Sequence, residues 1–239
     1  ADNGAMVNGV VNVTGNNDTN INIQTGNKGA NINGYVEITG NDNNNINLTA
    51  NGINSNTDGI IKIGSNNNSN INLNSDGNQA HNSSTINVSG NSNTDIIVGA
   101  QADGSYIRNY LSVTGNSNAP INITTNDIGS IITGTVQSSG NNNNDVNVHA
   151  DGVGSEISNF ILIDSTNDKV EINSTGNFSL VRGNINANNT NGKVYMNAEA
   201  ESSKIDGDLN VANNIGPVFM LSNNIHSYAD GYIVATGNT

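Results

Sequence analysis

Residues 15–23 read GNNDTNINI, a short polar run that leads into an alternation of apolar and polar residues. Related units begin at residues 40, 65, 90, 115 and 140, so the unit returns every 25 residues, and degenerate copies follow at steps of 24. The polar run is typical of a turn and the alternation is typical of a β-strand. A repeat of this length predicts a solenoid, in which each coil buries its apolar residues only against neighbouring coils.

The composition is unusual and fits a repeat protein. About a quarter of the 239 residues are Asn and 27 are Gly, whereas aromatic residues amount to 4% and Cys is absent. Low hydrophobicity with few aromatic residues can indicate disorder, but a disordered chain has no reason to keep its apolar residues in register. Because the repeat runs from end to end, we expect a single solenoid domain over residues 1–239.

The charge of the chain argues against several classes of partner. Seven basic and twenty acidic residues give a formal net charge of −13, which opposes binding to nucleic acid and to anionic lipid. No apolar run approaches the ~18 residues of a membrane span. We therefore expect no nucleic-acid partner and no membrane insertion. The lack of Cys excludes disulfides and thiolate sites.

Alignment of the repeats predicts three strands in each coil. The inward residues run from Val11 and Val13 to Ile233 and Ala235 in the first strand, from Ile21 and Ile23 to Val218 and Met220 in the second, and along a column of small residues from Ala5 to Ser227 in the third. The fold predicted is all-β, a single-stranded right-handed parallel β-helix (β-solenoid) with about 24–25 residues per coil and about nine to ten coils. The right hand follows from the rule for parallel crossover connections. An antiparallel sandwich would not keep one period.

Three local expectations follow from this alignment. Thr57 and Asn82 are polar where the third strand should be apolar, so these coils should be irregular there. The step from 25 to 24 should be a one-residue deletion in the Asn-rich turn, because both flanking strands keep their phase. Stacked amides can donate and accept along the axis, and the column predicted to form such a ladder is Asn22, Asn47, Asn72, Asn122 and Asn147.

The turn between the second and third strands suggests a calcium site. Asn-Gly and Asp-Gly pairs there suit a positive φ. Four carboxylates at similar phase would stack along one edge as hard oxygen donors, the ligands that Ca²⁺ prefers; they are Asp76, Asp103, Asp127 and Asp151. The alternative is that these acidic turns are simply solvated. We expect no other cofactor.

The pattern of charged residues does not favour an enzyme. Polysaccharide-degrading enzymes need carboxylates placed together across a cleft, whereas the acids here are scattered. Glu37 and Lys62 are outward neighbours on consecutive coils, and Asp206 and Asp208 flank one corner. A single Glu–Lys pair is more often a surface ion pair than a catalytic pair.

Candidate interfaces come from exposed aromatic residues and from the ends. The aromatic residues that the alternation places outward are Tyr35, Tyr106, Tyr110, Phe160, Tyr195, Phe219, Tyr228 and Tyr232. Most of them form a seam along one corner, which suggests contact with another subunit or ligand. Neither end shows a polar cap, and the chain starts at Val11 and Val13 in the same phase in which it stops at Ile233 and Ala235. Either subunits stack head to tail or the chain is a slice of a longer solenoid.

The units GNDNNNINL at residues 40–48 and YVEITG at residues 35–40 carry a resemblance to known proteins. The whole chain resembles the Asn/Gly-rich β-helical passengers of bacterial autotransporter adhesins and related bacterial or archaeal cell-surface repeat proteins. The resemblance is one of repeat style, without a translocator domain or a family motif. It implies an extracellular location and a host or surface glycan as partner.

These observations favour a structural role over catalysis. The leading hypothesis is a secreted surface filament or sheath subunit whose partner is the chain itself, through head-to-tail stacking of the ends and lateral contacts of the aromatic seam. The chain begins at Ala1, which fits either removal of a leader or an excised fragment. The alternative is an adhesin passenger that binds a glycan, and a polysaccharide-degrading enzyme is a third class.

Overall fold

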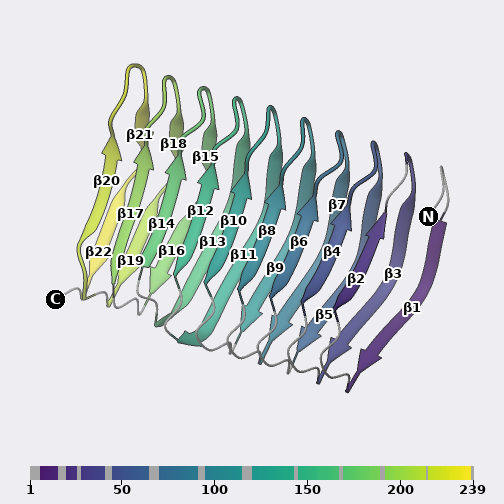
Figure 1. Cartoon of the computed structure of the whole chain (residues 1–239). Helices are drawn as coiled ribbons and strands as arrows, with labels where there is room; N and C mark the ends of the chain where they lie inside the picture. Colours follow the sequence, from purple (N-terminus) through teal and green to yellow (C-terminus); the bar gives the residue numbers. More distant parts are fainter. Residues whose placement is uncertain are drawn as a thin grey trace.

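The computed structural model of the chain describes residues 6–15, 20–25, 28–40, 45–64, 70–90, 95–114, 120–142, 145–166, 169–188, 192–213 and 215–237. These residues form strands that wind into a β-solenoid, with the two termini at opposite ends of the stack (Figure 1). Neighbouring strands pair in parallel. The all-β parallel solenoid expected from the repeat is therefore confirmed.

The described strands form two sheets, one of 13 strands and one of nine. The first sheet contains β1 (Met6–Thr14), β3 (Asn31–Thr39), β5 (Asn56–Gly64), β7 (His81–Ser89), β9 (Tyr106–Thr114), β11 (Ile131–Asn142), β13 (Glu156–Thr166), β15 (Leu180–Arg182), β16 (Ile185–Asn188), β18 (Lys204–Asp206), β19 (Leu209–Ala212), β21 (Tyr228–Asp230) and β22 (Ile233–Thr236). The second sheet contains β2 (Ile21–Thr25), β4 (Ile46–Ala50), β6 (Ile71–Ser75), β8 (Ile96–Ala100), β10 (Ile121–Thr125), β12 (Val146–Ala150), β14 (Lys169–Ser174), β17 (Lys193–Ala198) and β20 (Val218–Ser222).

The number of strands per coil differs along the stack. From β1 to β13, the segments predicted as third and first strands run on as one strand of 9 to 12 residues, so seven coils contain two strands each. In the coils that follow, two shorter strands take the same path: β15 and β16, β18 and β19, and β21 and β22. The prediction of three strands per coil therefore holds only for this last part. In the earlier coils the chain stays extended around the corner.

A column of glycines lies at this corner. Its members have φ values between 121° and 159° and are Gly9, Gly34, Gly59, Gly134, Gly183, Gly207 and Gly231. A Cβ atom on Gly34 would lie 2.0 Å from the carbonyl oxygen of Gly9. Ser84 and Asn109 hold this position in two consecutive coils, and the pairing between β7 and β9 skips it. The coils thus approach each other most closely where side chains are absent, a constraint that the repeat alignment missed.

The inner columns of the repeat are buried as expected. Ile46, Ile71 and Ile121 have no exposed surface. The column of small residues is at most 1% exposed in the inner coils, at Ala30, Ser55, Ala80, Ser105, Ser130, Ser155, Ser179 and Ser203. A serine here also closes the turn before it, because the Ser203 hydroxyl accepts a hydrogen bond from the Ala200 amide at 3.1 Å.

The register of the strands confirms where the repeat shortens. Between β11 and β13, Ser139 pairs with Asp164, a step of 25, and Asn142 pairs with Thr166, a step of 24. The register shift falls between Ser139 and Asn142, at the end of β11, where the Asn-rich run of this repeat begins. The backbone at Thr57 and Asn82 pairs in register with the neighbouring coils, and pairing is interrupted only after Asn82, between β7 and β9. The side chains of Thr57 and Asn82 and all of Ala5 lie outside the described residues.

In the turn from the second sheet back to the first, the expected positive φ is confirmed at the glycine after Asp103, with a φ of 62° at Gly104, but not at the other three pairs. Positive φ does not occur at the glycines after Asn51, Asp76 and Asp151. It occurs two residues further on, at Asn54, Gln79, Gly104, Gly129, Gly154, Phe178, Ser202 and His226. The glycine that follows Asn51 or Asp76 is required for a different reason, which is close contact between coils. A Cβ on Gly77 would lie 2.4 Å from the carbonyl oxygen of Gly52.

Candidate functional site

The last coil exposes residues of the inner columns. Ile233 is 42% exposed and Met220 is partly buried, whereas Leu209 and Met196, which hold the same positions one coil earlier, have no exposed surface. Ala235 is exposed as well. Strands β20, β21 and β22 each pair on one side only. This end therefore offers an apolar cross-section and unpaired strand edges within the described chain.

The first coil presents the matching surface. Val11, Val13 and Ile23 are partly buried, whereas Ile38 and Ile46 in the next coil are fully buried. Among the described residues, β1 pairs only with β3, and β2 pairs only with β4. The predicted end residues thus lie at the two open faces of the described stack.

The aromatic seam is present but interrupted. Pairing places Tyr35 and Tyr110 in one outward column and Tyr106 and Tyr228 in another, on either side of the glycine corner. Both apolar and polar residues stand between them in these columns: Ile60 and Thr85 in the first, and Ile131, Glu156, Leu180 and Lys204 in the second. Neighbouring side chains already contact the tyrosines: the Tyr110 hydroxyl donates to Gln137 at 2.8 Å. Further contacts are the Tyr106 hydroxyl with Thr133 at 3.0 Å, Lys62 over the Tyr35 ring at 5.2 Å and Lys204 over the Tyr228 ring at 4.8 Å. The Phe160 side chain lies outside the described residues, and Tyr232 is 75% exposed in the last coil.

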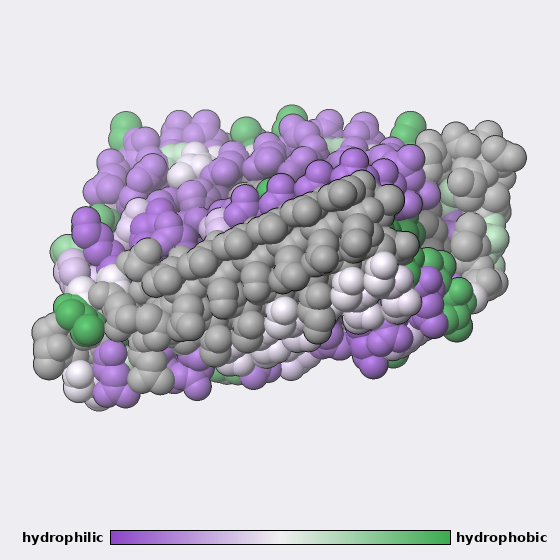
Figure 2. Space-filling view, turned by 60° about the horizontal axis from the view of Figure 1, so that its bottom comes forward, coloured by the Kyte–Doolittle hydropathy of each residue, from purple (hydrophilic) through white to green (hydrophobic). Residues whose placement is uncertain are grey.

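Other exposed apolar residues lie in the turns between the two sheets, where Ile53, Ile128, Val153 and Ile225 hold one turn position and polar residues hold it in other coils. Ile128 is 62% exposed and Phe178 is 64% exposed, both in turns between the two sheets. Figure 2 shows the hydrophobic residues on the face it draws as separate spots on a mostly hydrophilic surface. The exception in that view is a small group of hydrophobic residues at the right-hand end.

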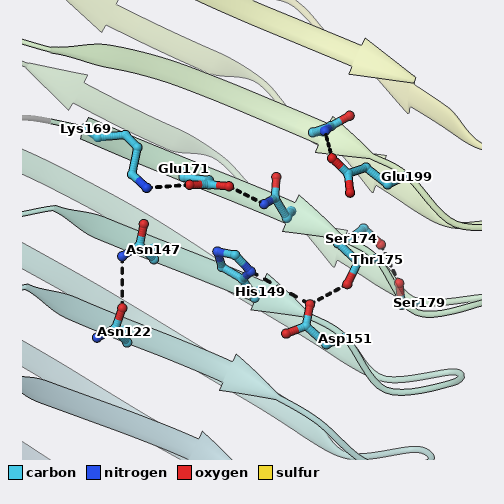
Figure 3. Close-up of polar contacts among 12 residues, drawn as sticks. Asn122, Asn147, His149, Asp151, Lys169, Glu171, Ser174, Thr175, Ser179 and Glu199 are labelled. Atoms are coloured by element: carbon cyan, nitrogen blue, oxygen red, sulfur yellow. Dashed lines mark hydrogen bonds and ion pairs between the residues drawn. The ribbon is translucent and has the colours of Figure 1, made fainter. Parts of the chain in front are cut away.

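The outer face of the second sheet changes character along the axis. In the first coils an amide ladder runs from Asn72 to Asn47 and on to Asn22, each Nδ2 donating to the next Oδ1 at 2.7 Å. The ladder is broken where Ile97 takes the same column and resumes with Asn147 donating to Asn122 at 2.9 Å. The predicted ladder is therefore confirmed in two pieces (Figure 3). In the last coils the column continues as Glu171, Tyr195 and Phe219.

A polar network surrounds Glu171 where the ladder ends. The Lys169 ammonium donates to Glu171 Oε2 at 2.7 Å, and Asn173 Nδ2 donates to Oε1 at 2.5 Å (Figure 3). Lys169 also lies 3.9 Å from Asp145. Burial raises the pKa of Glu171, but the hydrogen bonds from Lys169, Tyr195 and Asn173 outweigh it, so the pKa is lowered on balance. Glu171 is thus held as a carboxylate whose oxygens already have donors.

Tyr195 is held by the same network. Burial, followed by its hydrogen bond to Glu171 and the negative charges of Glu171, Glu199 and Asp145, raises the pKa of Tyr195 to about 12. Its hydroxyl donates to the carboxylate, which fixes the ring on the outer face of β17.

Two adjoining hollows lie over this part of the sheet and share Lys169. The first has a volume of about 300 Å³ and is lined by Asn122, Thr124, Asn147, His149, Lys169 and Glu171. The second has a volume of about 290 Å³ and is lined by Lys169, Lys193, Tyr195, Phe219 and Leu221. We call these two hollows together the outer groove. It is polar toward β10 and apolar toward β20.

The four predicted calcium ligands do not form one column. Pairing and hydrogen bonds place Asp76 and Asp151 at the residue after β6 and β12, three coils apart, which is about 14 Å along the axis. Asp127 lies one position later in its turn and Asp103 two positions later. Among the described residues, no three His, Cys, Asp or Glu side chains come together in a group that could hold a metal ion. The four residues therefore do not stack in the single column that was expected, and calcium binding itself stays a prediction.

The charged pair predicted on the first sheet is in place. Glu37 and Lys62 are paired in register on β3 and β5, and they line a hollow of about 350 Å³ with Thr39, Asn87 and Ser89. Glu37 is the one carboxylate among the residues that line it. A two-carboxylate arrangement of the kind that hydrolyses glycosides is not found in this hollow.

The coupling of Tyr195 to Glu171 predicts alkaline destabilisation. The folded chain holds the phenolic proton more tightly than the unfolded chain, whose tyrosines titrate near pH ~10. The stabilising effect is therefore present below pH ~10 and is lost as the pH rises toward the folded pKa of about 12. We expect one of the six tyrosines to ionise last in an ultraviolet absorbance titration. Tyr195→Phe should remove that late step, and an unchanged titration curve would contradict the assignment.

The outer groove was only partly visible in the sequence. Tyr195 and Phe219 were identified as outward aromatic residues, because strand alternation places them correctly. Lys169, Glu171 and Lys193 were missed. They lie in coils of 24 residues rather than 25. Their neighbours in the preceding coils can therefore be identified only when the position of the one-residue deletion is known.

No family model, curated protein or solved structure matches this chain. The described residues also include no helix with the length and hydropathy needed to cross a bilayer.

Proposed function

We propose that the chain is a structural subunit that assembles head to tail into an extracellular filament or sheath. The observation that carries this proposal is the pair of open faces, with Ile233 and Met220 at one end and Val11 and Ile23 at the other. Each coil of a solenoid binds the next through the same parallel register, so the two ends of one stack are complementary by construction. Open head-to-tail contacts of this kind extend without limit when the rotation does not close.

In the proposed joint, β2 of one subunit pairs with β20 of the next, and β1 pairs with β21 and β22. The inner residues Val218 and Met220 would then pack against Ile21 and Ile23, as Val194 and Met196 pack beneath them within one chain. Backbone pairing supplies the affinity, and burial of the apolar cross-section adds to it. A second subunit at this position also forms hydrogen bonds with the unpaired backbone groups of the edge strands, which would otherwise promote aggregation.

Electrostatics should regulate the assembly. With a net charge of −13, subunits repel one another at long range, and salt screens that repulsion. Assembly should therefore become stronger as the salt concentration rises from low to physiological values. The extracellular location belongs to the same proposal and is supported by the repeat style of the sequence alone.

Electron microscopy and sedimentation of residues 1–239 test the proposal, and we expect unbranched rods longer than one subunit. Ile233→Lys should weaken association by at least about a hundredfold, because burying an unpaired charge costs about 3 kcal/mol or more. Val234→Lys is the matched control: Val234 is 49% exposed on the outward side of the same strand, in register with Asn210. Dispersed single rods at high protein concentration, or equal effects of the two variants, would contradict head-to-tail stacking.

A further inference from the structure

We propose that the outer groove of the second sheet binds a linear oligosaccharide that lies along the axis of the solenoid. This inference does not depend on head-to-tail assembly, because the groove lies on the side of the rod and is complete within one chain. It spans β10 to β20 and joins two hollows of about 300 and 290 Å³. Each hollow is at the lower end of the size range of small-ligand sites, about 300–1,000 Å³.

The shape of the groove fits a chain of sugar rings. Its walls repeat from coil to coil at about 4.8 Å, the spacing of paired strands, which is close to the length of one sugar ring in an extended polysaccharide. Neighbouring rings of such a chain would therefore meet equivalent positions on neighbouring strands. The Asn122 and Asn147 amides present one such pair of positions, held in a fixed orientation by their mutual hydrogen bond.

The polar end of the groove offers rigid donors and acceptors. Thr124 and His149 project from β10 and β12 beside the amides, and Figure 3 shows His149 on the same side of the sheet as Asn147 and Glu171. Lys193 lines the second hollow and forms none of the ion pairs found among the described residues. Groups already fixed by the protein lose little entropy when they bind hydroxyls.

The apolar end offers flat surfaces. Phe219 is 44% exposed and lies next to Tyr195, its partner on the neighbouring strand, and both rings line the second hollow. A sugar ring has one apolar face of C–H groups, which can pack on an aromatic ring while its hydroxyls reach polar side chains. The groove therefore has polar side chains at one end and aromatic rings at the other. This combination suits a ligand whose edges carry hydroxyls and whose ring faces are apolar.

Other classes of ligand fit less well. Four of the strands beneath the groove, β10, β12, β14 and β17, are paired on both sides, so within the described chain a peptide would find a free backbone edge only at β20 and could not extend along the groove by strand pairing. The net charge of −13 repels nucleic acid. The charges that line the groove, Lys169 and Lys193 against Glu171, leave no large excess of either sign. The proposed ligand is therefore a neutral, hydroxyl-rich oligosaccharide.

Isothermal titration calorimetry with neutral cello-, xylo- and chito-oligosaccharides tests the proposal, with uronate oligosaccharides as the charged comparison. We expect at least one neutral series to bind, with affinity rising with chain length over the first few sugars. Phe219→Ala should lower the affinity at least tenfold. Tyr110→Ala is the matched control, because Tyr110 is also 44% exposed but lies on the first sheet.

Three results would overturn the proposal: no binding by any neutral series, unchanged binding by Phe219→Ala, or an equal loss in Tyr110→Ala. Preference for the uronates would reject the neutral class. Circular dichroism confirms that each variant is folded. Rod length in the electron microscope should be unchanged in Phe219→Ala if subunits stack, so failure of sugar binding and failure of assembly are distinguishable.

Discussion

Gly34→Ala is expected to destabilise the solenoid by more than about 3 kcal/mol, the range of severe core or strain mutations. The new Cβ would lie 2.0 Å from the carbonyl oxygen of Gly9 and 3.1 Å from its carbonyl carbon and amide nitrogen. These are backbone atoms that belong to the adjacent strand, so they cannot move aside without breaking the pairing of β1 with β3. Chemical denaturation followed by circular dichroism measures the effect.

Alanine substitutions at two other glycines serve as controls, because they introduce backbone strain without a steric clash between coils. Gly9 has nearly the same φ, 144° against 148°, but a Cβ added there would meet no atom within 4 Å, because no coil precedes it in the described stack. Gly129 has a φ of 63° and open space around it in the middle of the rod. Alanine at either position should cost only about 1–2 kcal/mol, the penalty of a left-handed or related backbone conformation. Equal losses at all three glycines would show that close approach of the coils is unimportant.

Ile123→Ala is expected to cost about 3–4 kcal/mol, within the range for removing a fully buried isoleucine side chain beyond its β-carbon. Ile123 has no exposed surface and lies between Val98 and Val148 of the neighbouring coils. Because the core is built from single columns, little surrounding structure can collapse into the cavity.

Ile23→Ala is the matched substitution in the same column of the first coil, where the side chain is only partly buried. It should cost about half as much in the single rod, in proportion to the smaller area removed from water. The difference between the two sites should shrink as protein concentration rises, because stacking would bury Ile23 as thoroughly as Ile123. A difference that does not change with concentration under conditions where rods lengthen would contradict the proposed joint.

Much of the fold could be predicted because the copies of the repeat can be aligned with one another within the single sequence. Equivalent residues are 25 or 24 positions apart, so stacking the sequence on itself is enough to place Ile46 above Ile21 and Asn47 above Asn22. Strand alternation then sorts inward from outward residues, and the burial of Ile38, Ile63 and Leu209 follows from it. Among the described residues, those predicted for interfaces lie at the ends and on the outward columns as this reasoning places them, and their role as interfaces stays a prediction.

The errors have a common cause, which is that sequence spacing does not show where the backbone bends. The four acidic turn residues looked equivalent because each stands near a glycine. The structure shows that these glycines serve two purposes: Gly104 supplies a positive φ, whereas Gly77 makes room for the coil before it. Without that distinction Asp76, Asp103 and Asp127 were assigned to one column. The merging of two expected strands into one went unnoticed for the same reason, since a smooth corner leaves no break in the alternation.

The sequence by itself determined the period, the parallel stacking and the buried columns, because a regular spacing of apolar residues admits one way of burying them. The tertiary structure decided which outward side chains become neighbours around corners and across the shortened repeat. The network of Lys169, Glu171 and Tyr195 and the groove beside it depend on a register shift between Ser139 and Asn142 and on side-chain geometry. GNNDTNINI builds the coil, and the contacts between coils determine what the surface of the rod presents to a partner.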